Sequence, residues 1–272
     1  MGRVTTVATA GVQGAQLYYE VAGVGHPLVL LHGGNADCRM WDDQFPVFTE
    51  RYRTVRYDAR GYGRSDFPDL PFSHRADLGA LLGTIGIGRA HLVGLSLGAM
   101  TALDSTLDHP ELTAALVLVS PGLGGYQYGS ETLQRQAPLL AALRAGDLPR
   151  ARAWWLDSTY CQTLRHHPAA AARMRQMVEG YTFAHSFRAK AALNQPLSPP
   201  AVDRLSEVRA PMLIVVGDQD DRDVRAIAEC LEAGIAGAKR IVFGGASHML
   251  NIEQPDAFNQ AVLDFFGGVP ST

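Results

Sequence analysis

The chain has 272 residues, of which 47% are hydrophobic and 19% are charged. This composition is typical of a globular protein and excludes a disordered or collagen-like chain. The 24 lysines and arginines are balanced by 27 acidic residues, which argues against a basic surface for nucleic acid. No apolar run approaches the roughly 20 residues that a membrane-spanning helix needs. We therefore expect neither a nucleic acid nor a membrane as a partner.

Short aliphatic and β-branched runs alternate with longer helical patterns along the chain. Strands are predicted at Leu17–Val21, Pro27–Leu31, Arg53–Tyr57, His91–Leu95, Ala115–Ser120, Pro211–Val216 and Arg240–Phe243. Helices are predicted at Ser73–Ile85, Leu97–Leu107, Asp223–Ala233 and Gln254–Phe266. Alternation of this kind indicates an α/β protein with a mostly parallel sheet and helices on both of its faces.

One long segment, from about Pro121 to Pro200, contains no clear strand. It is rich in Ala, Leu and Arg, and its aromatic residues include Trp154, Trp155, Tyr160, Tyr181, Phe183 and Phe187. The pattern predicts a helical insertion between two strands of the sheet. We therefore expect a core formed by residues 1–120 and 201–272 and an inserted unit formed by residues 121–200. The aromatic residues of that unit are expected to line an apolar pocket, although Trp154 and Trp155 could equally serve only to pack its helices.

The strongest chemical signal is the sequence Gly-Leu-Ser-Leu-Gly at Gly94–Gly98, between a predicted strand and a predicted helix. A GxSxG motif at such a junction is typical of a nucleophile elbow, in which a sharp turn exposes the serine hydroxyl. The amino terminus of the following helix favours negative charge at the same place. Ser96 is therefore the candidate nucleophile, and it requires a base.

The candidate base is His248, which follows the last predicted strand and precedes the last helix. This loop lies at the same edge of a parallel sheet as Ser96. His32, in the exit loop of an earlier strand, is expected to brace that loop instead. The adjacent His166 and His167 would point in different directions on a helix, which argues against a metal site. We expect neither a metal nor a cofactor.

The base needs a carboxylate that orients it, and four aspartates crowd the loop after the strand Pro211–Val216. Asp218 could make a turn and Asp223 could cap the following helix. Asp220, at the tip of the loop, is the preferred candidate, and Asp221 is the alternative.

An oxyanion hole needs two N–H donors. The first is expected from Leu97, directly after the nucleophile. The second is expected from the sequence His32-Gly33-Gly34-Asn35, where glycine permits a close backbone approach. Gly34 is preferred over Gly33, and a simple Gly-Gly turn is the alternative interpretation.

These features together resemble the α/β-hydrolase fold superfamily, and within it the capped serine esterases, enol-lactonases and perhydrolase-like enzymes. The matching stretches are His32-Gly33 with Trp41 nine residues later, Tyr57–Asp66, Gly94–Gly98, Gly217–Asp220 and Gly245–Pro255. The resemblance implies a mostly parallel central sheet flanked by helices, with a helical cap inserted after the sixth strand. It also implies Asp220 as the acid and Gly34 as the second N–H donor.

The expected activity is hydrolysis of a small-molecule carboxylic ester through an acyl-enzyme on Ser96. Lactonases, C–C bond hydrolases and perhydrolases use the same three residues, so these alternatives stay open. A serine nucleophile argues against the haloalkane dehalogenases and epoxide hydrolases of this fold, which use aspartate. A non-catalytic small-molecule receptor is the alternative outside the enzymes.

The cysteines Cys38, Cys161 and Cys230 are far apart and odd in number, with neither a CxxC nor a zinc-ligand spacing. No disulfide framework is expected, and a reducing cytoplasm is the expected compartment. The sequence indicates neither the natural substrate nor the oligomeric state.

Overall fold

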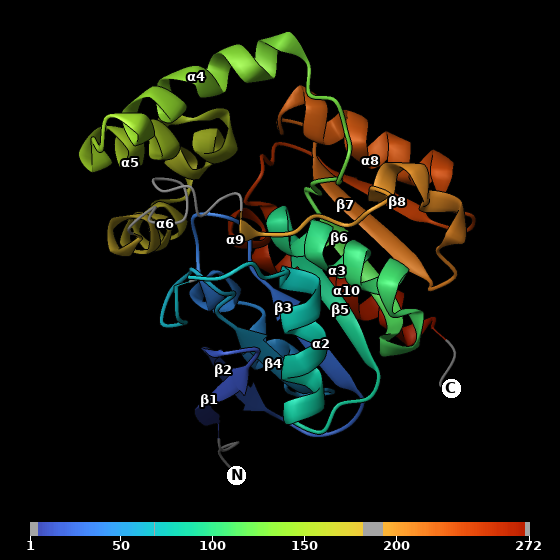
Figure 1. Ribbon diagram of the computed structural model, residues 1–272. Coiled ribbons are helices and arrows are strands. Elements are labelled where there is room, and N and C mark those ends of the chain that lie inside the picture. Colours follow the sequence, from blue (N-terminus) through green and yellow to red (C-terminus); the bar gives the residue numbers. More distant parts are fainter. Residues whose placement is uncertain (1–4, 68, 182–192, 270–272) are drawn as a thin grey trace.

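The computed structural model describes residues 5–67, 69–181 and 193–269. Its strands form one eight-stranded sheet in the order β1-β2-β4-β3-β5-β6-β7-β8 (Figure 1). They are β1 (Thr6–Val12), β2 (Ala15–Ala22), β3 (Pro27–Leu31), β4 (Arg53–Tyr57), β5 (Ala90–Leu95), β6 (Thr113–Val119), β7 (Met212–Gly217) and β8 (Lys239–Phe243). The β1–β2 and β2–β4 pairs are antiparallel, and every other pair is parallel.

The seven predicted strands are confirmed, with ends that shift by at most two residues. The prediction was wrong in omitting β1. This edge strand buries only Ala10 and Val12, so it lacks the apolar run of a central strand. It forms because a tight turn at Gln13 and Gly14, both with positive φ (45° and 79°), folds it back onto β2. Two such residues give the twist that a two-residue hairpin needs.

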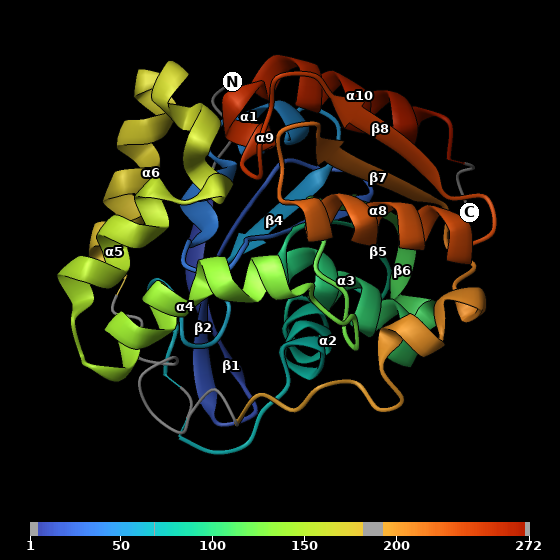
Figure 2. The same cartoon turned by 90° about the horizontal axis from the view of Figure 1, so that it is seen from above.

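Helices cover both faces of the sheet (Figure 2). The first face carries α2 (His74–Thr84), α3 (Leu97–Asp108) and α8 (Arg222–Gly234), and the other carries α1 (Phe45–Phe48) and α10 (Pro255–Gly267). Leu81, Leu103 and Ile227 are buried on the first face, whereas Phe48 and Phe258 are buried on the second. The four predicted helices are thereby confirmed as α2, α3, α8 and α10.

Shorter helical turns complete the core. They are η1 (Cys38–Trp41), η2 (Pro110–Leu112), η5 (Ala201–Asp203), η6 (Leu205–Glu207) and α9 (Leu250–Glu253). No helix within the described ranges is long and apolar enough to cross a membrane.

After β6, the described chain up to residue 181 carries four helical elements, which we call the inserted helices. They are α4 (Ser130–Arg144), α5 (Leu148–Asp157), η3 (Thr159–His166) and α6 (Pro168–Gly180). They lie together beyond the carboxyl ends of β5 and β6, above the core in Figure 1. Phe183 and Phe187 lie outside the described residues. Asn194 then returns to the core through a single bridge to Phe72.

Candidate active site

Ser96 occupies a strained turn between β5 and α3. Its φ and ψ are 53° and −107°, a conformation that side-chain-bearing residues rarely adopt. The neighbouring glycines explain how the turn packs. A Cβ atom on Gly94 would lie 2.3 Å from the carbonyl oxygen of Gly98, and one on Gly98 would lie 2.2 Å from that of Leu31. The two glycines therefore let the elbow sit directly against β3 with the serine half-exposed.

Backbone N–H groups surround Ser96 from two sides. Leu97 is the first residue of α3, where N–H groups have no intrahelical partner and the helix dipole is positive. Gly33 and Gly34 come from the loop after β3, and they line the same cavity as Ser96 and Leu97. The Gly33 N–H donates to the Met40 sulfur at 3.1 Å, so the N–H groups of Leu97 and Gly34 are the candidates for binding a negatively charged oxygen.

The ring of His32 links the glycine loop to Ala59 through two hydrogen bonds. Its Nε2 accepts a hydrogen bond from the Ala59 N–H at 2.9 Å, so this nitrogen carries no proton. The proton must then be on Nδ1, which lies 2.7 Å from the Gly33 carbonyl oxygen and donates to it. Because a peptide unit is planar and trans, fixing the Gly33 carbonyl also fixes the opposite direction of the Gly34 N–H.

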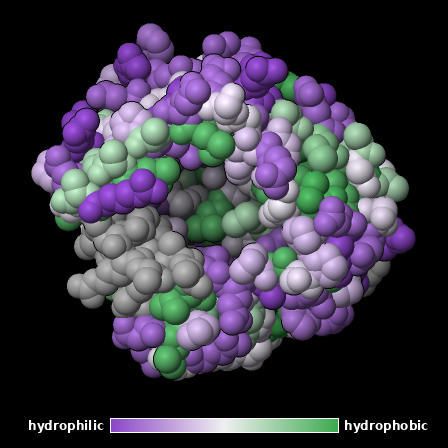
Figure 3. Space-filling model, turned by 45° about the horizontal axis from the view of Figure 1, so that its top comes forward, coloured by the Kyte–Doolittle hydropathy of each residue, from purple (hydrophilic) through white to green (hydrophobic). Residues whose placement is uncertain are grey.

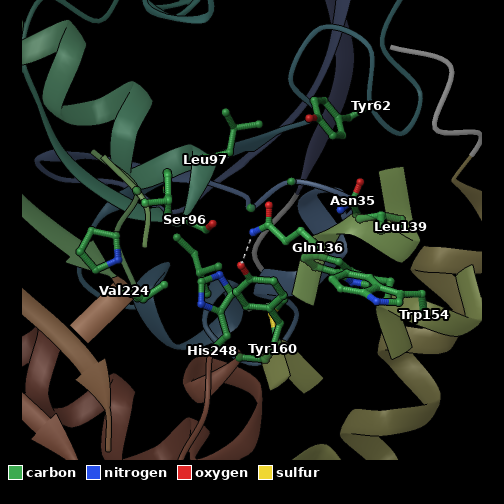
Figure 4. Close-up of a pocket in the computed structure, with 18 residues that line it drawn as sticks. Asn35, Tyr62, Ser96, Leu97, Gln136, Leu139, Trp154, Tyr160, Val224 and His248 are labelled. Carbon is green, nitrogen blue, oxygen red and sulfur yellow. Dashed lines mark hydrogen bonds between the residues drawn. The ribbon is translucent and has the colours of Figure 1, made fainter. Parts of the chain in front are cut away.

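His248 and Asp220 form a buried pair. The His248 Nδ1 lies 3.0 Å from Asp220 Oδ1 and 3.1 Å from Oδ2, and both side chains are at most 3% exposed. Asp220 Oδ1 also accepts a hydrogen bond from the Asp221 N–H at 2.7 Å. This arrangement leaves the other ring nitrogen of His248 for the cavity, where Figure 4 shows His248 and Ser96 together.

The other aspartates of the loop have different partners. Asp221 caps α8 through the Asp223 N–H at 3.0 Å and forms an ion pair with Arg135. The expectation that Asp223 caps this helix is therefore wrong. Its carboxylate accepts from the N–H of Gly129 at 2.9 Å instead.

Asp218 accepts a hydrogen bond from the Gly245 N–H at 2.8 Å, in the loop that leads to His248. Asp218 does lie in a turn, as expected, since the Asp220 N–H donates to the Gly217 carbonyl at 3.2 Å. Its carboxylate bonds the other loop instead of its own backbone. Among the four aspartates, the structure places Asp220 against the histidine.

A buried network that sequence reasoning missed holds the residue before His248. Ser247 donates from its N–H to Glu253 Oε2 at 2.8 Å and from its hydroxyl to Oε1 at 2.7 Å. The Thr163 hydroxyl of η3 lies 2.6 Å from the same serine hydroxyl. The network links the histidine loop both to α9 and to the inserted helices.

The cavity over Ser96 has a volume of about 330 Å³ and lies between the core and the inserted helices. Figure 3 shows a hollow with apolar residues in it on this side of the molecule. From the inserted unit, the lining includes Tyr128, Gln136, Leu139, Trp154, Trp155 and Tyr160. The interpretation that Trp154 and Trp155 only pack the inserted helices is therefore wrong, because both line this cavity. Tyr62, from the loop after β4, and Gln136 were not predicted as site residues. Tyr62 lies in the matching stretch Tyr57–Asp66, to which no chemical role was assigned, and Gln136 lies in no motif.

Tyr160 lies directly against the histidine. Its ring centroid is 4.8 Å from that of His248 and 5.2 Å from that of Trp155. Burial raises the pKa of the Tyr160 phenol, and the negative charge of Asp221 adds to this effect. The hydroxyl therefore stays protonated at neutral pH.

Within the described ranges, no group of three or more His, Cys, Asp or Glu side chains could hold a metal ion. His166 ends η3 and His167 follows it, both away from the residues that line the cavity over Ser96. The cysteines Cys38, Cys161 and Cys230 are free.

The eight-stranded sheet and the elbow after β5 define the α/β-hydrolase fold. Residues 28–261 match the alpha/beta hydrolase family, and the chain belongs to this family of hydrolase enzymes.

Three known proteins illustrate the similarity. The chain is 31% identical over 264 residues to a 2-hydroxy-6-oxononadienedioate/2-hydroxy-6-oxononatrienedioate hydrolase of Paraburkholderia phymatum, covering 93% of this chain and 91% of the relative. A hydrolase structure from Pseudomonas aeruginosa has 29% identity and a TM-score of 0.81, covering 96% and 98% of the two chains. Est816, an N-acyl homoserine lactone degrading enzyme, has 28% identity and a TM-score of 0.77, covering 95% and 100%.

Proposed function

We propose that the protein is a serine hydrolase that cleaves a carboxylic ester through an acyl-enzyme. Ser96 is the nucleophile, His248 the general base and acid, and Asp220 the residue that orients the imidazole. The observation that carries the proposal is the buried Asp220–His248 pair at 3.0 Å, in one cavity with a serine held in a strained turn.

The geometry supports a two-stage reaction. The Ser96 hydroxyl attacks the carbonyl carbon while His248 takes its proton. The oxyanion that forms accepts hydrogen bonds from the N–H groups of Leu97 and Gly34. When the carbon–oxygen bond breaks, His248 gives the proton to the leaving alcohol. A water molecule then loses a proton to His248 and attacks the acyl group, which releases the acid and restores Ser96.

Residues 121–200 act in this proposal as a cap over a core of residues 1–120 and 201–272. This interpretation is supported by the cavity over Ser96, because eight of the residues that line it belong to the inserted unit. The aromatic lining favours an apolar acyl or alcohol group on a small substrate. Neither a metal nor a cofactor takes part, and a cytoplasmic location remains part of the proposal.

Cleavage of a C–C bond is the second candidate, because the relative at 31% identity is named for the hydrolysis of a 2-hydroxy-6-oxo dienedioate. Lactone opening is supported in the same way by the lactone-degrading Est816. In both reactions the same serine would attack a carbonyl carbon, with a carbon or a ring oxygen as the leaving atom. Possible perhydrolysis of an acyl-enzyme by peroxide belongs to this group.

The test is hydrolysis of p-nitrophenyl esters of increasing acyl length by the wild type and by Ser96→Ala. Ser120→Ala is the matched control, since Ser120 is a buried serine at the end of the neighbouring strand β6. We expect turnover that Ser96→Ala abolishes and Ser120→Ala keeps. If esters are not cleaved but a fluorophosphonate labels Ser96, lactones and 2-hydroxy-6-oxo dienoates are tested next. Neither turnover nor labelling would favour a small-molecule receptor and refute the proposal.

A further inference from the structure

One polar side chain of the inserted helices enters the cavity beside the nucleophile. Gln136 extends from α4 into the cavity, with its amide between Ser96 and Tyr160 in the view of Figure 4. The remaining lining contributed by α4 and α5 is apolar or aromatic, as in Leu139 and Trp154. Asn35, from the loop after β3, adds a second amide to the cavity, but Gln136 is the only amide that α4 and α5 contribute. An amide among apolar side chains can determine specificity, because an unpaired polar group is costly to bury.

The orientation of this amide is set by a hydrogen bond. The Gln136 Nε2 donates to the Tyr160 hydroxyl at 2.9 Å. Tyr160 is itself held between the rings of Trp155 and His248. The Gln136 Oε1 accepts no hydrogen bond from the part of the chain that the structure describes, and it is left as an acceptor in the cavity.

The helix that carries Gln136 is anchored next to it. Arg135 forms an ion pair with the buried carboxylate of Asp221 and a second one, at 2.9 Å, with Glu131. Behind Gln136 lies another cavity of about 350 Å³, and Gln136, Trp154 and Tyr160 line both cavities. These three side chains therefore form a wall between the two cavities, and its only amide is that of Gln136.

We propose that Gln136 selects substrates that carry an O–H or N–H donor close to the scissile carbonyl group. The inference rests on the proposed function, since it assigns a substrate class to the same site. A substrate with such a donor pairs with Oε1 when it displaces water. A substrate with a methyl group there leaves the amide oxygen buried and unpaired, which lowers affinity. Tyr160 acts as a positioning residue, because its hydroxyl holds the amide in the accepting orientation.

The test compares benzyl lactate with benzyl isobutyrate, which differ by a hydroxyl in place of a methyl group next to the ester carbonyl. Binding is measured in the Ser96→Ala background by titration of tryptophan fluorescence, because Trp154 and Trp155 line the cavity. We expect roughly tenfold tighter binding of the lactate. The preference should disappear in Gln136→Leu, persist in Gln136→Glu, which keeps an acceptor oxygen, and fall in Tyr160→Phe.

Leu139→Val is the matched control, since Leu139 lines the same cavity one turn further along α4. It should change the affinity for both esters by the same factor. Equal affinity for the two esters in the unsubstituted pocket, a preference that survives Gln136→Leu, or binding of neither ester overturns the inference. Hydrolysis of both esters by the wild type is measured in parallel. Selective binding without hydrolysis would refute the proposed esterase function alone, and hydrolysis without selectivity would refute the inference alone.

Discussion

Substitutions of His32 can separate its effect on the orientation of the proposed oxyanion hole from its effect on the stability of the loop. The Nδ1–H donates to the Gly33 carbonyl and Nε2 accepts from the Ala59 N–H. Asparagine can place an amide nitrogen near the position of Nδ1, and glutamine can place its amide oxygen near that of Nε2. His32→Asn therefore keeps the bond to Gly33 and loses the one from Ala59, whereas His32→Gln does the reverse.

The two substitutions should cost similar stability and different activity. Each leaves one backbone group near the buried His32 without its partner, which costs about 1–3 kcal/mol of unfolding free energy. Only the loss of the Gly33 bond frees the peptide unit that directs the Gly34 N–H. Deleting an oxyanion-hole donor lowers kcat by about 10²–10³. An N–H donor that points in the wrong direction should lower kcat by a smaller factor than its deletion does. We therefore expect about a tenfold or greater loss of kcat in His32→Gln and a loss of less than about threefold in His32→Asn.

The assay is ester hydrolysis at saturating substrate, together with urea denaturation of each variant. KM should change little, since the N–H contact strengthens only as charge develops on the oxygen. Equal kcat values in the two variants would show that His32 acts only on stability. A lower kcat in His32→Asn than in His32→Gln would refute the peptide-plane argument.

The remaining predictions concern the triad and two buried titratable groups. Asp220→Asn should lower kcat by about 10⁴ in ester hydrolysis, because the imidazole loses the carboxylate that fixes its tautomer. Burial raises the pKa of Asp104 to about 6, above an unfolded value of about 3.9. The folded state thus binds the extra proton, and stability falls as the pH rises from about 4 to 6. In urea denaturation, Asp104→Asn should raise the unfolding free energy above that range by at most about 3 kcal/mol, and change it little near pH 4. Burial lowers the pKa of His91 to about 4, below an unfolded value of about 6.5. Stability should therefore fall as the pH drops from about 6.5 to 4. His91→Phe keeps the stacking on Phe266. In thermal unfolding, this variant should lose less stability than the wild type when the pH falls.

The central fold could be predicted because its strands are buried on both faces. β3, β5, β6 and β7 are mostly apolar and buried along nearly their whole length, with His91 and Thr113 as the polar exceptions, and the segments between them carry helical periodicity. β1 carries no such signal, since its outer residues face solvent and its place depends on the hairpin turn and on pairing with β2. An edge strand of this kind is specified by backbone hydrogen bonds, which composition does not record.

The candidate site likewise contains residues whose positions the sequence could predict and residues whose partners it could not. Ser96, His248 and Asp220 follow strand ends, and the carboxyl ends of parallel strands converge at one edge of the sheet, so their meeting follows from topology. The roles of the neighbouring aspartates could not be assigned so easily. Asp221 and Asp223 have the same side chain in the same loop, and only the path of α4 past α8 decides that Asp221 pairs with Arg135.

The inserted helices place polar groups in the site without any sequence motif. Gln136 and Tyr160 are 24 residues apart, on α4 and η3, and meet because both elements pack against α5. Thr163 reaches Ser247 across 84 residues in the same way, so the inserted helices also contact the loop that carries His248. A sequence motif can predict a chemical role when one tight turn positions all of its residues, as at Gly94–Gly98. The proposed selectivity of Gln136 depends instead on how separate helices pack against each other. Such packing could be read only from the three-dimensional structure.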